Sequence, residues 1–325
     1  MIMDFLLKEE TIFWLNIVST KQVSQNMQNS QLLSLIAPLI LALMMLGMGL
    51  SLTVNDFSRL FIKPKAVLLG VGLQTIALPV TGYFLLIFSG LTAELAVGFM
   101  LLVACPGGPG SNLVSYICRG DAALSVTLTA ISSLLAVITI PLVVNFSIAE
   151  FMQAGHVNIS VLKTVLAVLF ITLVPLSLGM VIARRFPAFA AAAEQKVKFF
   201  SILFLLALVF YTFYKERNHL SELIQQVGLL TILLCILTLL IGFLVSRMLG
   251  FNSRIQKTIA IEVGIQNSAL AIVVAGSILQ SNLMAVPAAM YSPVMISASL
   301  MFLLYEFWFR FIKRRRTDKP APSAA

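Results

Sequence analysis

The chain has 325 residues, of which 59% are hydrophobic and only 11% are charged. Soluble domains carry about 25% charged residues, so this composition excludes an ordinary soluble domain and predicts an all-α, polytopic membrane protein. The net charge of +9 does not indicate nucleic-acid binding, because the basic residues lie between apolar segments and in one terminal run. The three cysteines lie in apolar segments without metal-ligand spacing, which disfavours a disulfide framework.

Residues 1–30 are apolar at first and then polar from Lys21 to Asn26. The apolar part is amphipathic, and the polar part is unsuited to a bilayer span of about 20 residues. We therefore predict an N-terminal amphipathic or degenerate first helix in this segment.

Nine apolar segments follow, each near the length that a bilayer requires. The expected helices are 31–51, 66–89, 92–118, 122–146, 159–183, 197–214, 223–248, 255–279 and 284–311. If residues 1–30 also span, the count becomes ten. Residues 313–325 combine a basic run with a Pro- and Ala-rich end, which predicts a disordered tail.

Lysine and arginine are distributed unequally between the two sets of loops. One side collects Arg59, Lys63, Lys65, Arg119, Arg184, Arg185, Lys196, Lys198, Arg247, Arg254, Lys257, Arg310, Lys313, Arg314, Arg315, Arg316 and Lys319. The other side holds Lys215 and Arg217, with Lys163 just inside a helix. Because cytoplasmic loops are enriched in basic residues, the C-terminus is expected in the cytoplasm and the protein in the plasma (inner) membrane.

Two of the segments contain residues that interrupt an apolar helix. The segment 92–118 contains Cys105-Pro106-Gly107-Gly108-Pro109-Gly110-Ser111-Asn112, whose prolines and glycines disfavour a continuous helix. The segment 255–279 contains Glu262-Val263-Gly264-Ile265-Gln266-Asn267-Ser268. A charged side chain at the bilayer centre costs about 2.5–3.5 kcal/mol, so Glu262 indicates a functional site.

The two interruptions lie at corresponding positions of two halves. Gly107 and Gly264 are 157 residues apart, close to half the chain. A single break is more often a packing kink, but paired discontinuous helices are typical of secondary transporters built on inverted repeats. We predict a first repeat at 31–150 and a second at 151–312, with the two broken helices crossing.

The polar residues in and near the breaks are suited to a hard cation, which prefers several oxygen ligands. Candidate ligands are Glu262, Gln266, Asn267, Ser111, Asn112, Ser125, Thr129 and Gln74, together with freed backbone carbonyls. Ser125 and Thr129 are four apart and share one helix face. The half-helix that begins near Pro109 and Gly110 offers free backbone donors and a positive dipole end to an anion.

These motifs resemble the bile acid:sodium symporter (BASS) family, including its bacterial members. The resemblance rests on Cys105–Asn112, Arg119-Gly120, Leu124-Ser125 and Glu262–Ser268, with further matches at Leu46–Leu50, Asp56-Phe57, Lys63-Pro64-Lys65 and Gln74. It covers about residues 40–310. It implies a sodium-coupled symporter that imports a small organic anion, in which a core domain moves against a smaller panel domain to give alternating access.

The resemblance also implies two sodium sites. Ser111, Asn112, Ser125, Thr129 and Glu262 match the first site. Gln74, Glu262 and Gln266, with the backbone oxygens of Val263 and Ile265, match the second. Asn267, Pro109 and Gly110 are expected to face the substrate. The first helix pair of each half would form the panel.

The sequence leaves the cargo open among bile-acid-like, pantoate-like and keto acids. Pro109 stands where some relatives carry a hydroxyl residue, and the last helix lacks the Asn that some relatives place there. Met44, Met45 and Met48 are interpreted as packing residues. The alternative is a proton-coupled transporter or a metalloid or anion exporter of related fold; a membrane sensor or an enzyme is less favoured. We expect a monomer in the lipid bilayer, with no nucleic-acid partner.

Overall fold

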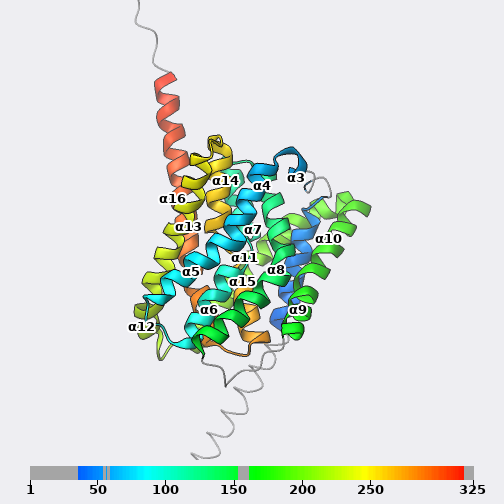
Figure 1. Ribbon diagram of the computed structural model, residues 1–325. Coiled ribbons are helices and arrows are strands. Elements are labelled where there is room, and N and C mark those ends of the chain that lie inside the picture. Colours follow the sequence, from blue (N-terminus) through cyan, green and yellow to red (C-terminus); the bar gives the residue numbers. More distant parts are fainter. Residues whose placement is uncertain (1–35, 54–55, 57–58, 153–160, 318–325) are drawn as a thin grey trace, which may run out of the picture.

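The computed structural model describes residues 36–53, 56, 59–152 and 161–317 of the protein (Figure 1). Within these ranges the fold is all-helical and contains no β-strand. The N-terminal helix expected in residues 1–30 lies outside the described residues. The tail differs from expectation at its start, because the last helix continues to Thr317. Residues 318–325 lie outside the described residues.

The first half of the chain contains both short and long helical segments. They are Ile36–Leu50, which carries no label in Figure 1, α3 (Arg59–Ile62), α4 (Pro64–Gly72), η1 (Leu73–Ala77), α5 (Leu78–Ile87), α6 (Ala93–Ala104), α7 (Pro109–Ile117) and α8 (Ala122–Phe151). Helix α8 starts at the N-cap Asp121, whose side chain accepts a hydrogen bond from Leu124 N.

The second half is also entirely helical within the described residues. Its elements are α9 (Val161–Val168), η2 (Leu169–Leu173), α10 (Val174–Arg185), α11 (Pro187–Lys215), α12 (Leu220–Leu223), η3 (Ile224–Gly228), α13 (Leu229–Met248), α14 (Ser253–Gly264), α15 (Ser268–Val273), η4 (Val274–Ile278), η5 (Leu283–Ala285) and α16 (Val286–Thr317). The segments η1 to η4 are π-helical, and η5 is a 3-10 turn.

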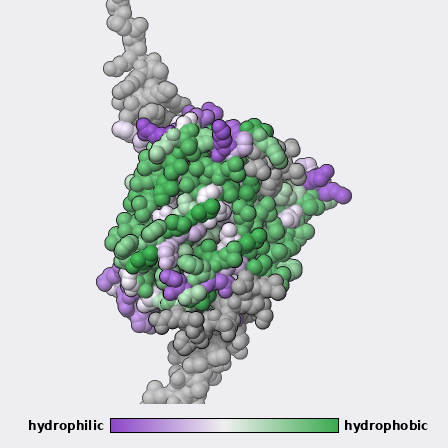
Figure 2. All heavy atoms as spheres, viewed as in Figure 1, coloured by the Kyte–Doolittle hydropathy of each residue, from purple (hydrophilic) through white to green (hydrophobic). Residues whose placement is uncertain are grey.

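Five helical stretches of the described chain are long and apolar enough to cross a membrane by length and composition. They are Pro64–Ile87, Ala122–Phe151, Thr164–Arg185, Leu220–Met248 and Leu283–Trp308. Figure 2 shows an apolar surface between two hydrophilic ends, as a bilayer-spanning protein requires. The protein is therefore a polytopic membrane protein, and the count of nine spans stays a prediction.

Two of the π-helical segments have a local cause in the sequence. Pro79 and Pro175 each lie two residues after such a segment. Proline has no N–H and its ring crowds the carbonyl four residues earlier, so the preceding turn widens. Consistently, Leu78 N bonds to Leu73 O and Val174 N to Leu169 O, five residues back. The expected helices are present there, but each contains one wide turn.

The buried core centres on helices that are apolar on every side. All residues of α6 from Leu95 to Ala104 are buried, and all residues of α15 are buried. A helix that is hydrophobic all round belongs in the interior. Helix α8 packs along α6, and α13 packs along α14. The two interrupted helices are thereby held at the centre of the molecule (Figure 1).

Candidate functional site

Both interrupted segments break where the sequence predicts. Helix α6 ends at Ala104, and Pro109 starts α7 at a position where its missing N–H leaves no bond unmade. Helix α14 ends at Gly264, and α15 starts at Ser268 with Asn267 as its N-cap. Each break is therefore a short extended linker between two half-helices.

The two linkers cross and pair with each other. Gly107 and Gln266 form an antiparallel bridge, and Asn267 N donates to Pro106 O at 2.9 Å. These contacts satisfy backbone groups that the breaks would otherwise leave unpaired in the membrane interior. The crossing brings together residues that are more than 150 positions apart in the sequence.

The Glu262 side chain is buried beside this crossing, with 2% of its surface exposed. Ser125 Oγ donates to Glu262 Oε2 at 2.9 Å, and Thr129 Oγ1 donates to Glu262 Oε1. Gly107 lies against the carboxylate, since a Cβ atom at this position would collide with Glu262 Oε1. Two hydroxyls and the absence of a side chain at 107 thus accommodate the buried acid.

Ser111 and Asn112 complete this first cluster. Asn112 Oδ1 accepts from Ser125 Oγ at 2.9 Å and from Thr129 Oγ1 at 3.0 Å. The Ser111 hydroxyl is fully buried, faces the Glu262 carboxylate and donates to Gly108 O at 2.7 Å.

The first cluster has more oxygen acceptors than hydrogens to share. Each hydroxyl supplies one hydrogen, but Ser125 and Thr129 each contact both the Asn112 amide oxygen and a carboxylate oxygen of Glu262. Buried acceptors without a donor are costly, and a bound cation removes that cost. The donor set, a carboxylate with hydroxyl and amide oxygens, fits Na⁺.

Gln74 and Gln266 form a second cluster on the other side of the break. Gln74 Nε2 donates to Gln266 Oε1 at 2.7 Å and to Cys105 O at 2.9 Å. Gln266 Nε2 donates to Val263 O at 2.7 Å. The Gln74 Oε1 atom is buried and has no hydrogen-bond partner. This atom is an open acceptor, and it also fits a hard cation.

The two clusters are connected by the backbone between Glu262 and Gln266, and no described side-chain hydrogen bond of Glu262 links them. Among the described contacts, the Glu262 carboxylate bonds only to the first cluster, and none of its hydrogen bonds reaches Gln74 or Gln266. Ile265 is adjacent to Gln266 in the sequence, and its side chain lines a pocket. The shared use of Glu262 by two sites therefore stays a prediction.

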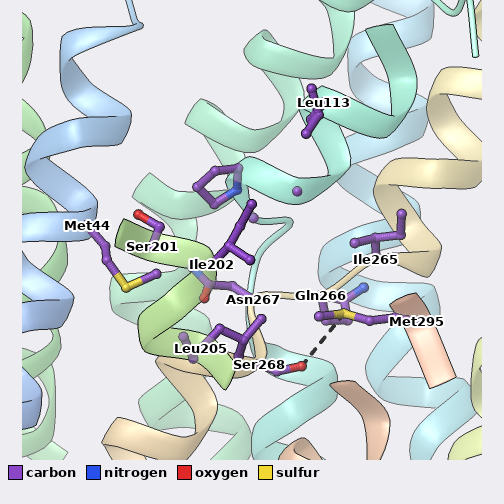
Figure 3. A pocket seen from close by; sticks show the side chains of 14 residues that line it. Met44, Leu113, Ser201, Ile202, Leu205, Ile265, Gln266, Asn267, Ser268 and Met295 are labelled. Atoms are coloured by element: carbon purple, nitrogen blue, oxygen red, sulfur yellow. Dashed lines mark hydrogen bonds between the residues drawn. The ribbon is translucent and has the colours of Figure 1, made fainter. Parts of the chain in front are cut away.

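A pocket of about 110 Å³ lies next to the crossing (Figure 3). One wall comes from the two breaks and α16, and the opposite wall comes from the helix Ile36–Leu50 and α11. The lining residues are Met44, Gly108, Pro109, Gly110, Leu113, Ser201, Ile202, Leu205, Ile265, Gln266, Asn267, Ser268, Ala269 and Met295. Most of these side chains are apolar, which suits the organic part of a ligand.

Asn267 supplies a polar group to this pocket. Its Oδ1 caps α15 by accepting from Leu270 N at 3.1 Å. Its Nδ2 is buried and has no hydrogen-bond partner. Pro109 and Gly110 line the same pocket at the start of α7, where backbone donors and the helix dipole favour negative charge. All three predicted substrate residues thus surround one cavity.

Several contributors to the site were not predicted from the sequence. Met44 is a buried core residue, as the sequence predicts, and it also lines the pocket. Ser201, Ile202 and Leu205 of α11 also line it, and an apolar helix carries no local signal for such a role. Tyr291 donates its hydroxyl to Gly264 O at 2.6 Å; a tyrosine in the middle of an apolar membrane segment was the available signal.

A helical membrane protein with two interrupted helices crossing at buried polar clusters is built as a membrane transporter. The chain belongs to the sodium bile acid symporter family, whose model matches residues 38–223. The matched range contains the first break, and the second break lies beyond it.

Three relatives illustrate this membership. The Bacillus subtilis (strain 168) "uncharacterized sodium-dependent transporter YocS" is 34% identical, covering 86% of this chain and 84% of its own. A "probable sodium/metabolite cotransporter BASS1, chloroplastic" of Arabidopsis thaliana is 32% identical, covering 78% of this chain and 62% of its own. The "sodium/bile acid cotransporter 5" of Rattus norvegicus is 30% identical, covering 83% of this chain and 62% of its own.

The family and its relatives are transporters, so this protein is a sodium-dependent membrane transporter and not an enzyme. The chain spans less than two thirds of the length of the plant and rat relatives.

Proposed function

We propose that this protein is a sodium-coupled symporter that imports a small organic anion by alternating access. One observation carries the proposal. Of the three buried side-chain polar atoms without a hydrogen-bond partner in the described residues, one is an acceptor, Gln74 Oε1, beside the break, and one is a donor, Asn267 Nδ2, lining the pocket. An open acceptor can bind a cation or a hydrogen-bond donor, and an open donor can bind an anion or a carbonyl.

Two sodium ions are proposed at the two polar clusters. The first ion would take oxygens from Ser111, Asn112, Ser125, Thr129 and Glu262. The second would take oxygens from Gln74, Glu262 and Gln266 and from the carbonyls of Val263 and Ile265. The excess of acceptors around Glu262 and the open oxygen of Gln74 support these assignments. On binding, the hydroxyl hydrogens would turn away so that their oxygens face the ion.

The anion is proposed in the pocket, with its charged group at Asn267 Nδ2 and the start of α7 around Pro109 and Gly110. The apolar remainder of the lining would contact its organic part. Coupling then has a physical origin in the chain itself. Gln266 belongs to a cation cluster and is adjacent to Asn267, so ordering either site orders the other.

The proposed architecture has nine spans in inverted repeats, 31–150 and 151–312. The core would contain the crossing, and the panel would contain the helix Ile36–Leu50 with α9 to α11. Two panel helices face the core across the pocket, which supports a motion of one domain against the other. A monomer is proposed.

The proposed orientation places the C-terminus in the cytoplasm of a cell with the protein in its plasma membrane. Lys63 and Lys257 lie at the end where α4 and α14 begin, whereas only Lys215 and Arg217 precede α12 at the opposite end (Figure 1). The larger number of lysines and arginines on the first side supports this orientation.

Uptake by proteoliposomes tests the proposal. A bile acid, pantoate and a keto acid are offered with an inward Na⁺ gradient, with choline replacing Na⁺ in the control. We expect at least one anion to accumulate only with Na⁺, and Glu262→Ala to abolish the accumulation. Glu150→Gln, at an exposed acid that contacts Tyr83, is the matched control and retains it. Accumulation that follows pH but ignores Na⁺ would favour the proton-coupled alternative instead.

If two Na⁺ accompany one monoanion, each cycle moves one net positive charge inward. A negative interior then contributes about 2.3 kcal/mol per 100 mV to the uptake. Imposing a potassium diffusion potential should accelerate transport, and an unchanged rate would contradict a stoichiometry of two.

A further inference from the structure

We propose that Tyr291 is a positioning residue for the sodium site, acting through the peptide that joins Gly264 to Ile265. This inference rests on the proposed function, because it concerns the carbonyls on either side of that peptide. Tyr291 belongs to α16 and is fully buried. Its hydroxyl donates to Gly264 O at 2.6 Å, the terminal carbonyl of half-helix α14.

The end of a helix leaves its last carbonyls without partners in the helix. At α14 three of them have found partners of different kinds. Ile261 O accepts from Ile265 N at 2.9 Å, Val263 O accepts from the Gln266 side chain, and Gly264 O accepts from Tyr291. Only the Tyr291 bond comes from a separate helix, so it ties the break to α16.

The peptide between Gly264 and Ile265 is held at both of its edges. Its oxygen is bonded to Tyr291, and its N–H is bonded to Ile261 O. Because a peptide unit is planar, fixing both edges fixes its orientation. The neighbouring carbonyls of Val263 and Ile265 are the proposed sodium ligands. Each belongs to the adjacent peptide unit and is one φ/ψ pair away, so restraining this unit restrains both carbonyls.

The glycine at position 264 explains why a hydrogen bond from Tyr291 is needed to orient this peptide. Gly264 has no Cβ, and a Cβ there would collide with the Leu239 side chain, so packing against α13 favours glycine. Glycine is also the residue with the widest backbone freedom. Without the Tyr291 bond, the peptide after Gly264 would be held at one edge only, and the two proposed carbonyl ligands would be less well oriented.

Helix α16 is suited to this role because it is tied to α14 at a second point. Lys257 Nζ lies 2.6 Å from Glu306 Oε2, so an ion pair joins the first half of α14 to the far part of α16. On the other side of the break, Ser268 Oγ contacts Met295 Sδ at 3.8 Å, one turn after Tyr291. The same helix therefore contacts both ends of the interrupted segment.

Sodium binding to the purified protein in detergent tests the role without a substrate. The melting temperature is followed as NaCl replaces choline chloride at constant ionic strength, in wild type, Tyr291→Phe and Tyr83→Phe. Tyr83 donates to Glu150 at 2.9 Å, so its variant also loses one tyrosine hydrogen bond but is remote from the proposed site. We expect Tyr291→Phe alone to raise the half-maximal Na⁺ concentration by about threefold to tenfold, the effect of one lost positioning bond.

A purely structural role gives a different pattern. It would lower the melting temperature in choline and leave the half-maximal Na⁺ concentration (the Na⁺ midpoint) unchanged, and that result would overturn the inference. Tyr291→Met, similar in size and without a hydroxyl, is the second variant; if neither variant folds, the hydroxyl serves folding and the inference is rejected. A wild type that shows no response to Na⁺ would instead reject the proposed sodium sites themselves.

Discussion

At the scale of single residues, the site is defined by atoms that lack a partner. The Glu262 carboxylate and the Asn112 amide oxygen share too few hydroxyl hydrogens. Gln74 Oε1 has no donor, and Asn267 Nδ2 has no acceptor. A buried polar group without a partner costs about 1–3 kcal/mol. Two such atoms, beside a buried carboxylate with too few donors, are difficult to explain by packing, and they are what a site for a cation and an anion requires.

Asn267→Asp tests the anion side. The aspartate keeps an oxygen that caps α15 but replaces the open donor with negative charge, so the helix start is preserved. A hydrogen bond to a charged group contributes about 1.5–3 kcal/mol, so uptake of the transported anion should fall by about tenfold to a hundredfold. Na⁺-dependent stabilisation should persist. Undiminished uptake would remove Asn267 from the substrate site.

Gly107→Ala tests the space around the carboxylate. The added methyl collides with Glu262 Oε1, so the carboxylate must move away from Ser125 and Thr129. Overpacking of this kind costs about 1–3 kcal/mol, and we expect the Na⁺ midpoint in the melting assay to rise accordingly. Gly72→Ala is the control, since nothing lies within 4 Å of its Cβ position. Equal midpoints in both variants would contradict the proposed site.

At the scale of elements, close helix contacts decide which helices move together. A Cβ on Gly49 would collide with Leu176 O, and one on Gly179 would collide with Leu46 O. Small residues let membrane helices approach backbone to backbone. The helix Ile36–Leu50 and α10 are thus joined as one unit. The glycines of the segment Leu46–Leu50, which the sequence offered only as a family match, gain a packing reason here.

Gly179→Ala should weaken this helix pair. The methyl forces the two backbones apart, which is expected to destabilise the protein by about 1–3 kcal/mol. The loss should appear as a lower melting temperature in choline, with the Na⁺ midpoint unchanged. Gly228→Ala, where the nearest atom lies at an ordinary 3.7 Å, serves as the matched control. A melting temperature equal to that of the control would argue against a tight contact.

At the scale of the whole molecule, the pocket lies between two groups of helices. Met44 and Ser201 approach from one group, and Asn267 and Met295 approach from the other. Ligand contacts on both walls allow binding to change the separation of the two groups. This arrangement is the physical basis for proposing alternating access, in which the pocket opens to one side of the membrane at a time.

Labelling of Ser201→Cys from the two sides of the membrane tests this motion. The native cysteines, Cys105, Cys118 and Cys235, are buried and should react slowly. We expect the new thiol to react with an impermeant reagent from one side, at a rate that Na⁺ changes by about threefold or more. A threefold change corresponds to a shift of about 0.7 kcal/mol in the equilibrium between the two conformations. The rate from the opposite side should change in the other direction. Parallel changes from both sides would rule out alternating access.

The sequence alone determined the class of the molecule and the positions of its breaks. Apolar length fixes where helices can cross a bilayer, and the Pro and Gly residues at 105–110 prevent a continuous helix through local sterics. The identity of the polar residues also pointed to sodium, because a carboxylate with hydroxyls and amides suits a hard cation. These are properties of short stretches, so a sequence carries them directly.

Only the tertiary structure decided which groups meet. Ser125 reaches Glu262 across 137 positions, and Tyr291 reaches the Gly264 carbonyl from another helix. Met44 and α11 complete the pocket although their own sequences are merely apolar. Such contacts depend on the register and crossing of helices far apart in the chain, which no local pattern encodes. The sequence thus specified the ligands, and the packing of helices specified the site.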